Sequence, residues 1–145
     1  AEIAAPRHHT ALFDPRDPQW HAAQAEMSGY SDYDAESVRL ILERVPCDQR
    51  GVLAYDANGV PAAAVLVAVA NGISIYGNVV TRASHRGQGF GRAGMNAAIA
   101  WARDAGALAA GIQVAAGNTP AIKLYSSLGF AHAYDYHYRK PQPAK

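Results

Sequence analysis

The stretch Arg86-Gly87-Gln88-Gly89-Phe90-Gly91 decides the fold of this chain of 145 residues. A strand is predicted before it, over residues 73–81, and a helix after it, over about residues 91–104. The first turn of a helix has unpaired N–H groups and a partial positive charge, and glycines let the backbone approach an anion closely. Basic side chains gather at the same turn, namely Arg82, His85, Arg86 and Arg92. The stretch therefore predicts a site for a phosphate or pyrophosphate.

The spacing of these glycines disfavours two common phosphate-binding motifs. A nucleoside-triphosphate loop ends in Gly-Lys-Ser or Gly-Lys-Thr, whereas Gly91 is followed by Arg92-Ala93. A dinucleotide-binding turn needs its third glycine one residue later and an acidic residue about twenty residues further on, and neither is present here. An enzyme of nucleotide phosphates is therefore a poor interpretation of this turn.

Two helices are predicted near the start of the chain. Asp17 followed by Pro18 is typical of a helix start, and this helix stops at Gly29. A second helix is expected from near Asp34 until Pro46 ends it. One face of this second helix is predicted to be buried through Val38, Ile41, Leu42 and Val45.

Three strands are predicted next, over residues 51–56, 61–70 and 73–81. The turns between them contain Asn58-Gly59 and Asn71-Gly72, and both residue types tolerate a positive φ. The pattern predicts an antiparallel meander whose middle strand is the most buried, because that strand is apolar on both faces.

Beyond the glycine turn and its helix, the pattern predicts a strand over residues 108–116. Thr119, followed by Pro120, is expected to cap another helix that Gly129 closes. Residues 130–139 alternate with period two and are predicted to form a last strand. Together, these predicted helices and strands indicate an α/β fold, with a mixed, mostly antiparallel sheet and helices on both faces.

The composition narrows the class of protein. Thirteen Lys and Arg against twelve Asp and Glu give a net charge of +1, which disfavours binding to nucleic acid through bulk charge. The longest apolar run, residues 60–70, is too short to span a bilayer, and no signal peptide is visible, so neither a membrane partner nor export is expected. A single cysteine, Cys47, excludes an internal disulfide framework and favours a reducing, cytoplasmic compartment. The six histidines show no metal-ligand spacing, so no metal site is predicted.

A second group of residues, about thirty positions downstream, identifies a family. Asn118, Ala121, Leu124-Tyr125 and Gly129-Phe130 match the pattern Asn-x-x-Ala-x-x-Leu-Tyr-x-x-x-Gly-Phe, while Arg86, Gly89 and Gly91 match Arg/Gln-x-x-Gly-x-Gly/Ala. Together they closely resemble the GNAT superfamily of acyl-CoA-dependent N-acetyltransferases. The resemblance is strong over residues 73–130 and weaker before them. It implies a single GNAT domain over residues 1–145.

The resemblance implies where acetyl-CoA binds. Backbone N–H groups would hold the pyrophosphate, and strand edge groups would pair with the amides of the pantetheine arm, one N–H of Val79 or Val80 facing the thioester carbonyl. Asn118 would contact the cofactor near the pantetheine, or would simply be a turn residue. The implied cofactor-binding residues are Val79, Val80, Thr81, Arg86, Gly87, Gln88, Gly89, Phe90, Gly91, Arg92 and Asn118.

The same resemblance makes Tyr125 the catalytic general acid. Its hydroxyl would protonate the departing thiolate, which is an easy transfer between a phenol of pKa about 10 and a thiol of about 8.5. Many members carry a glutamate as general base on the strand before the glycine turn, but residues 73–81 have no carboxylate. The substitutes that remain open are a water relay, an amine bound in its neutral form, or a side chain among Tyr76, His132, Asp135 and His137.

The function implied is transfer of an acetyl group from acetyl-CoA to a primary amine by direct attack in a ternary complex. The alternative is a non-catalytic acyl-CoA-binding or sensing module, which the absent carboxylate favours slightly. The acceptor, a small-molecule or peptide amine, is not specified by the sequence. Acidic residues near the second helix, Asp32, Asp34 and Glu36, would attract a cationic amine or simply cap that helix.

Two departures from the family concern the ends of the chain. The opening strand has one candidate, residues 9–13, and the closing region ends soon after one tyrosine-rich segment. We hypothesise that the chain is the catalytic part of a longer or tandem protein, or that a partner chain supplies its last strand, as in a homodimer.

Overall fold

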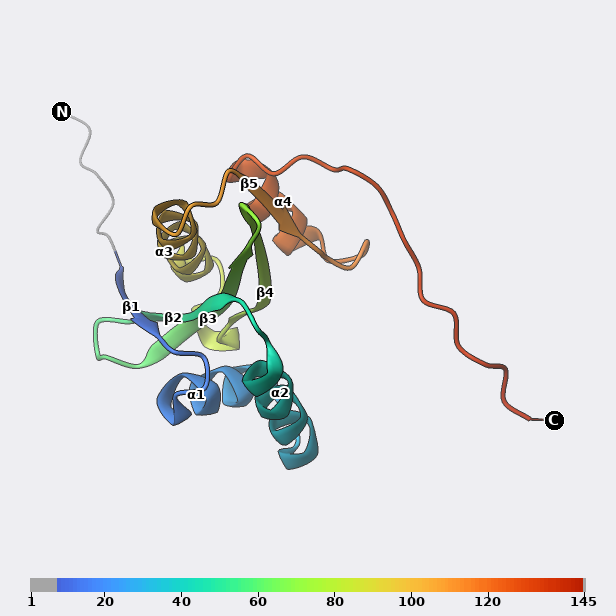
Figure 1. Cartoon of the computed structure of the whole chain (residues 1–145). Coiled ribbons are helices and arrows are strands. Elements are labelled where there is room, and N and C mark those ends of the chain that lie inside the picture. The colour runs from blue at the N-terminus through green and yellow to red at the C-terminus, as the bar shows by residue number, and fades with distance from the viewer. Residues whose placement is uncertain (1–7, 145) are drawn as a thin grey trace.

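A computed structural model describes residues 8–144 as one five-stranded sheet covered by helices (Figure 1). The strands lie in the order of the sequence, β1-β2-β3-β4-β5. The first four are antiparallel and β5 is parallel to β4, which confirms the predicted mixed, mostly antiparallel sheet. The elements are β1 His9–Phe13, α1 Pro18–Ser28, α2 Asp32–Arg44, β2 Asp48–Tyr55, β3 Pro61–Ala70, β4 Ile73–Thr81, the 3-10 turn η1 Ala83–His85, α3 Phe90–Asp104, β5 Ala109–Ile112 and α4 Thr119–Ser127.

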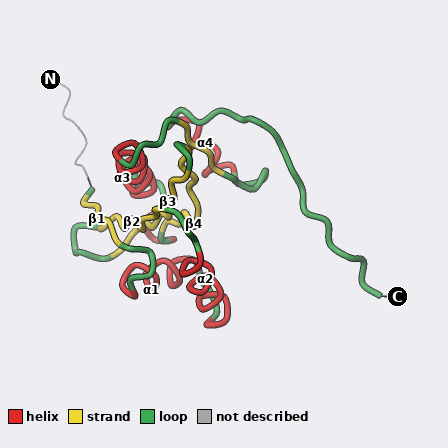
Figure 2. The backbone as a smooth tube through the Cα atoms, viewed as in Figure 1, coloured by secondary structure: helices red, strands yellow, loops and turns green. Residues whose placement is uncertain are grey.

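The helices lie in two layers, with α1 and α2 on one face of the sheet and α3 and α4 on the other (Figures 1 and 2). Each layer has its own hydrophobic core. On the α1 side, Trp20 and Leu42 pack with Leu53 of β2, and on the α3 side Met95 and Tyr125 pack with Val67 of β3. The central strand β3 is buried on both faces over most of its length, as its apolar sequence predicts.

Local sequence signals account for most boundaries. Asp17 caps α1 by accepting from the Gln19 N–H, and Gly29 ends it with φ +67°. Asn71 and Gly72 both adopt positive φ, which is the two-residue hairpin turn that their sequence favours. The opening strand β1 forms over residues 9–13, the only candidate that the sequence offered.

Several predicted boundaries and contacts are wrong. In α2 only Leu42 is buried, whereas Ile41 is 62% exposed, because this short helix turns a narrow stripe toward the sheet. Asn118, not Thr119, caps α4, since its side-chain oxygen reaches the Ala121 N–H at 3.3 Å. Strand β5 is four residues long rather than nine.

The predicted strand over residues 130–139 does not form. The segment has no secondary structure, its residues beyond Phe130 are exposed, and it leads away from the sheet (Figure 1). A period-two pattern describes only which side chains could share a face. A strand also needs a neighbouring backbone to pair with, and among the described residues nothing pairs with this segment.

Candidate active site

Strands β4 and β5 pair at one end and separate at the other. Their register runs from Ile73 opposite Ala109 to Tyr76 opposite Ile112, and no pair follows. Residues 77–81 of β4 thus have no β5 partner on that edge, although Gly77, Val80 and Thr81 still pair with β3 on the other edge. The two strands therefore splay apart here and leave an edge of β4 with backbone groups available to a ligand, at the residues that the resemblance implies for the pantetheine arm.

A bulge lies in β4 at the point where the strands separate. The pairing with β3 shifts between Ala64 and Leu66, and Asn78 adopts φ +48°. Asparagine tolerates this left-handed conformation better than most residues. The side chains of Val79 and Val80 alternate as neighbours on a strand do, with Val79 packing on the α3 side and Val80 on the α1 side.

The glycine turn leads directly from this strand into α3. Gly87 and Gly89 have φ +73° and +86°, a region that L side chains rarely adopt, so the glycines are required by the backbone. Gly91 lies against the end of β4, because a Cβ at Gly91 would be 3.1 Å from the Thr81 hydroxyl oxygen. The turn is therefore held next to the splayed edge.

Helix α3 differs from the other α-helices of residues 8–144 at its N-terminus. Asp17, Ser31 and Asn118 cap α1, α2 and α4 through their side chains, whereas Gly89 at the start of α3 provides no side-chain hydrogen bond. The first N–H groups of α3 are thus left for another acceptor, and the turn before them is exposed. Phosphate oxygens are the acceptors that fit such an end.

The basic side chains around the turn have different surroundings. Arg92 donates to the Ser127 hydroxyl at 2.6 Å and so links α3 to the end of α4. Arg82 donates to the Pro61 carbonyl and to Glu26, both at 2.8 Å, which ties the turn to α1. Arg86 is exposed, as are Gly87 and Gln88 beside it.

Tyr125 lies on α4 and faces the α3-side core. It is 7% exposed and belongs to the same cluster against which Val79 packs, so the structure brings the predicted acid and the splayed strand to one layer. Its ring meets Phe130 edge-on at 6.2 Å. Burial raises the pKa of Tyr125 above the usual value for a phenol, which is itself high enough to keep the hydroxyl protonated at neutral pH.

Asn118, the remaining implied cofactor contact, uses its side-chain oxygen to cap α4. This supports the structural interpretation of that residue, with its amide nitrogen still available. The cap also fixes the start of the helix that carries Tyr125.

The candidate general bases are not gathered at one place. Tyr76 is buried and its hydroxyl accepts from Ser74 Oγ at 3.0 Å, and burial raises its pKa. His132, Asp135 and His137 lie on the exposed segment after Phe130, where His132 and Asp135 face each other at 3.0 Å. None of these three is brought next to Tyr125.

The acidic residues of α2 mostly have local partners. Asp34 forms a capping box with Ser31, and Glu36 pairs with Arg39 at 2.6 Å. Asp32 lies in the first turn of the helix. Capping therefore explains Asp34 without any acceptor amine.

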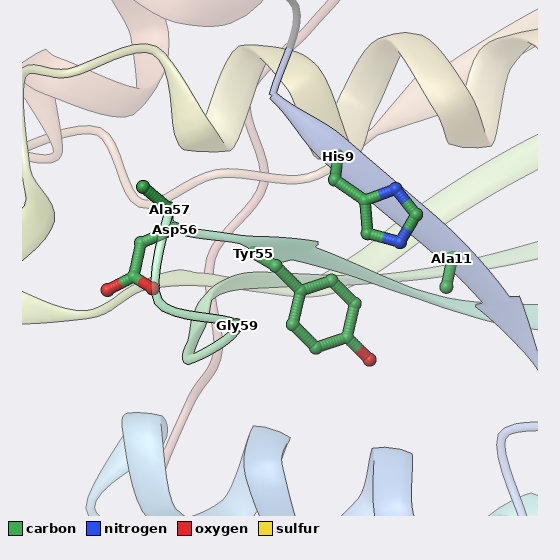
Figure 3. A pocket seen from close by; sticks show the side chains of 6 residues that line it. All are labelled: His9, Ala11, Tyr55, Asp56, Ala57 and Gly59. Atoms are coloured by element: carbon green, nitrogen blue, oxygen red, sulfur yellow. The ribbon is translucent and has the colours of Figure 1, made fainter.

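A shallow hollow of about 400 Å³ lies between β1 and the β2–β3 hairpin (Figure 3). Its lining comes from the strand ends and the hairpin, through His9, Ala11, Tyr55, Asp56, Ala57 and Gly59. None of the residues predicted to hold the cofactor lines it. The hollow is therefore not formed by the proposed cofactor residues, although Asp56 in its lining lies 2.8 Å from His85.

Three residues near the turn were missed by sequence reasoning. Asn78, which makes the bulge, could have been suspected from an asparagine after a glycine inside a strand. Asp56 and His8 reach the turn from distant parts of the chain, at 2.8 Å from His85 and 2.7 Å from the Gln88 carbonyl. Nothing in a single sequence signals such long-range contacts.

Comparison with known proteins gives the same interpretation. The model described as the acetyltransferase (GNAT) family matches residues 14–130. Among curated proteins, "uncharacterized N-acetyltransferase YobR" of Bacillus subtilis (strain 168) is 29% identical over 120 residues, covering 83% of this chain and 48% of that protein. The chain thus spans about half the length of this curated relative.

Solved structures share the fold at low sequence identity. A Klebsiella pneumoniae protein, provisionally assigned as an acyl-CoA N-acyltransferase, has a TM-score of 0.72 at 20% identity, covering 94% of this chain and 91% of that one. AAC(6')-Iy, solved with the bisubstrate analogue CoA-S-monomethyl-acetylneamine, has a TM-score of 0.68 at 17% identity over 92% and 99%. The aminoglycoside 6'-N-acetyltransferase AAC(6')-IG of Acinetobacter haemolyticus has a TM-score of 0.69 at 15% identity over 94% and 99%.

Proposed function

Because this chain belongs to the acetyltransferase (GNAT) family, we propose that it transfers an acetyl group from acetyl-CoA to a primary amine by direct attack in a ternary complex. One observation carries the proposal. The open edge of β4 adjoins the uncapped start of α3, since Gly91 lies against Thr81, and Tyr125 belongs to the hydrophobic cluster against which Val79 packs.

The chain offers acetyl-CoA two sets of backbone groups. N–H groups of residues 86–92 would bind the diphosphate, because α3 has no side-chain cap and its first turn carries a partial positive charge. The edge of β4 over residues 79–81 would bind the amides of the pantetheine arm, as an added strand does. An N–H of Val79 or Val80 at the bulge would bind the thioester oxygen as negative charge develops on it.

Tyr125 would donate its proton to the departing sulfur. Its hydroxyl is protonated at neutral pH, as a general acid must be, although burial raises its pKa and so makes it a weaker acid than a free phenol. Among the described residues no hydrogen bond involves this hydroxyl, which is not among the fully buried polar atoms, so it remains available to a substrate atom.

The acceptor would be a small-molecule or peptide amine. One relative in fold is named as an aminoglycoside acetyltransferase and another was solved with an acetylneamine bisubstrate analogue, but their identity of 15–17% supports the fold rather than the substrate. A cationic amine must lose a proton before it attacks a carbonyl. Since β4 carries no carboxylate, we expect water or an amine bound in its neutral form to meet this need.

The alternative, a non-catalytic acyl-CoA-binding module, is favoured by one observation. The histidines and the aspartate named as base candidates lie on the exposed segment after Phe130, away from Tyr125. Such a module would bind acetyl-CoA without turnover, which makes the two functions separable by one assay.

The test is release of thiol from acetyl-CoA with a panel of amines, for the wild type and for Tyr125→Phe. We expect turnover by the wild type and a fall in kcat on the order of a hundredfold in the variant, since general acids contribute about 10²–10⁴. The Kd for CoA, measured by calorimetry, should change less than about threefold. Tyr134→Phe, which alters a tyrosine that is 77% exposed, is the matched control and should behave as the wild type.

Two results would revise the assignment. An unchanged kcat in Tyr125→Phe would remove this residue from the acid role. Tight CoA binding by the wild type without turnover on any amine would favour the sensing module.

The proposal extends to assembly as a homodimer. Strand β5 has β4 on one side and no strand on the other among the described residues, and the segment after Phe130 alternates tyrosines without a pairing partner. Two copies could satisfy both by pairing this segment with β5 of the partner subunit.

A further inference from the structure

Phe90, the first residue of α3, is enclosed by two histidines from separate parts of the chain. The His8 ring stacks on it at 3.9 Å between centroids with 23° between planes. The His85 ring meets it edge-on at 5.5 Å and 72°. Phe90 is 5% exposed and directly follows Gly89, so its ring anchors the end of the glycine turn.

His85 fastens the start of the turn to the β2–β3 hairpin. Its Nε2 lies 2.8 Å from Asp56 Oδ2, and the two side chains are only 19% and 14% exposed. Asp56 is itself fixed, since its Oδ1 accepts from the N–H groups of Asn58 and Val60 at 2.9 Å each. These bonds lower the pKa of Asp56, the Val60 N–H contributing most, so the carboxylate stays ionised beside the ring.

His8 fixes one peptide of the turn. Its Nε2 lies 2.7 Å from the Gln88 carbonyl oxygen, and a carbonyl only accepts, so the ring nitrogen donates. The peptide bond is planar and trans, so the N–H of Gly89 points opposite to that carbonyl. The bond therefore sets the direction of an N–H that belongs to the proposed diphosphate site.

We propose that His85, with Asp56, and His8 are positioning residues that hold the glycine turn in its ligand-binding form before the ligand arrives. Gly87 and Gly89 give the free turn many accessible conformations, and ordering them upon binding would weaken affinity. His8, just before β1, and Asp56, in the β2–β3 hairpin, restrain the turn through these contacts. Less conformational entropy is then lost when the ligand binds. This inference rests on the proposed binding of acetyl-CoA at residues 86–92.

The first measurement is the affinity for CoA and for pantetheine, which has the arm but no diphosphate. His85→Ala should weaken CoA binding about tenfold and leave pantetheine binding within about twofold, because the restraint acts on the diphosphate site alone. His85→Gln, which keeps a donor toward Asp56, should recover most of the affinity. His8→Ala should act in the same direction through Gln88.

The matched control is His9→Ala. His9 is the next residue to His8, but its ring faces Tyr55 at 5.6 Å, and in Figure 3 the Asp56 carboxyl points away from both rings. This variant should bind CoA as the wild type does. A merely structural loss would instead appear as a lowered Tm in every variant that binds weakly.

The second measurement needs no ligand. Amide hydrogen exchange of the free protein should accelerate at residues 86–90 in His85→Ala, while exchange in β3 stays unchanged. Equal CoA affinity and equal exchange in His85→Ala and the wild type would overturn the positioning role and leave the proposed function intact. Failure of the wild type to bind CoA would overturn the proposed function, and the positioning role with it.

Discussion

Trp20 fixes α1 to the sheet through a site that only glycine can provide. The indole is fully buried, and its Nε1 donates to the Val52 carbonyl at 3.1 Å. The ring lies directly over Gly51, where a Cβ would come 2.5 Å from the Trp20 Cδ2 atom. The close approach makes one glycine as important for this core as the large residue above it.

Substitution of that glycine should be costly for stability. Gly51→Ala must displace the indole or the strand, and overpacking of this kind lowers the free energy of unfolding by about 2–3 kcal/mol. Chemical denaturation of the wild type and the variant measures this loss. Gly77→Ala is the matched control within the same sheet, since a Cβ there meets nothing within 4 Å, and we expect a change below about 0.5 kcal/mol. Equal losses in the two variants would contradict this account.

Single residues also mark where sequence reasoning was sufficient and where it was not. The cap at Asp17, the stop at Gly29 and the turn at Asn71-Gly72 were predictable, because each depends on a conformation set by its own neighbours. Ile41 was misplaced because the width of the stripe that a helix buries depends on how the helix packs on the sheet, and periodicity alone did not choose between Ile41 and Leu42.

Among the elements, the joint between β1 and α1 depends on a local ion pair. Arg16 donates to Asp14 through Nε at 2.8 Å and through its backbone N–H at 2.9 Å. These bonds lower the pKa of Asp14 from 3.8 to about 2, the side-chain bond contributing most. The ionised carboxylate is thus favoured in the folded chain relative to the unfolded one.

The ion pair between Asp14 and Arg16 should stabilise the folded chain only above acidic pH. The contribution is complete above about pH 4 and is lost as pH falls toward 2, because the folded pKa is the lower one. The pair is about half exposed, so solvent screening limits its size to about 1 kcal/mol or less. Urea unfolding of the wild type and Asp14→Asn should differ at pH 6, and the difference should fall to less than half by pH 2.5, because the folded pKa is about 2. A difference that persists unchanged at the lower pH would refute the assignment.

The order and type of the elements were predictable up to α4, and the active-site geometry was predictable only in part. The glycine turn and Tyr125 could be assigned because the residues that define them are close in sequence. The bulge at Asn78 and the absence of a cap on α3 depend on how β3, β4 and β5 pair, which no local pattern contains. The segment 130–139 failed for the same reason, as it alternates like a strand but has no strand beside it.

At the scale of the whole molecule, the β5 end of the sheet is open. The β5 end leaves apolar side chains uncovered, with Ile73 48%, Ile75 52% and Leu108 95% exposed. Large exposed apolar groups beside an unpaired strand edge are typical of a surface that another chain covers. No helix of residues 8–144 is both long enough and apolar enough to cross a membrane.

The homodimer proposed above is tested by sedimentation over a range of concentrations. We expect the mass of two chains for the full chain, and the mass of one chain when residues 131–145 are removed, because those residues would supply the strand at β5. A single-chain mass for the full chain at all concentrations would exclude this assembly. Circular dichroism of the shortened chain serves as the control for folding, since the residues beyond Phe130 are exposed and contribute no core.

The uncapped start of α3 has a consequence for the life of the protein in the cell. This helix contributes Phe90, Met95, Ala98 and Ala102 to the interior, so whatever completes its first turn also resists melting of the domain. Under the proposed function that role falls to the acyl donor, and a donor present at a hundred times its Kd would add about 2.7 kcal/mol to the folded state. Under this proposal, the fraction of unfolded molecules would rise as the concentration of acetyl-CoA falls, because ligand binding and folding are linked. The protein would then be degraded faster when acetyl-CoA is scarce.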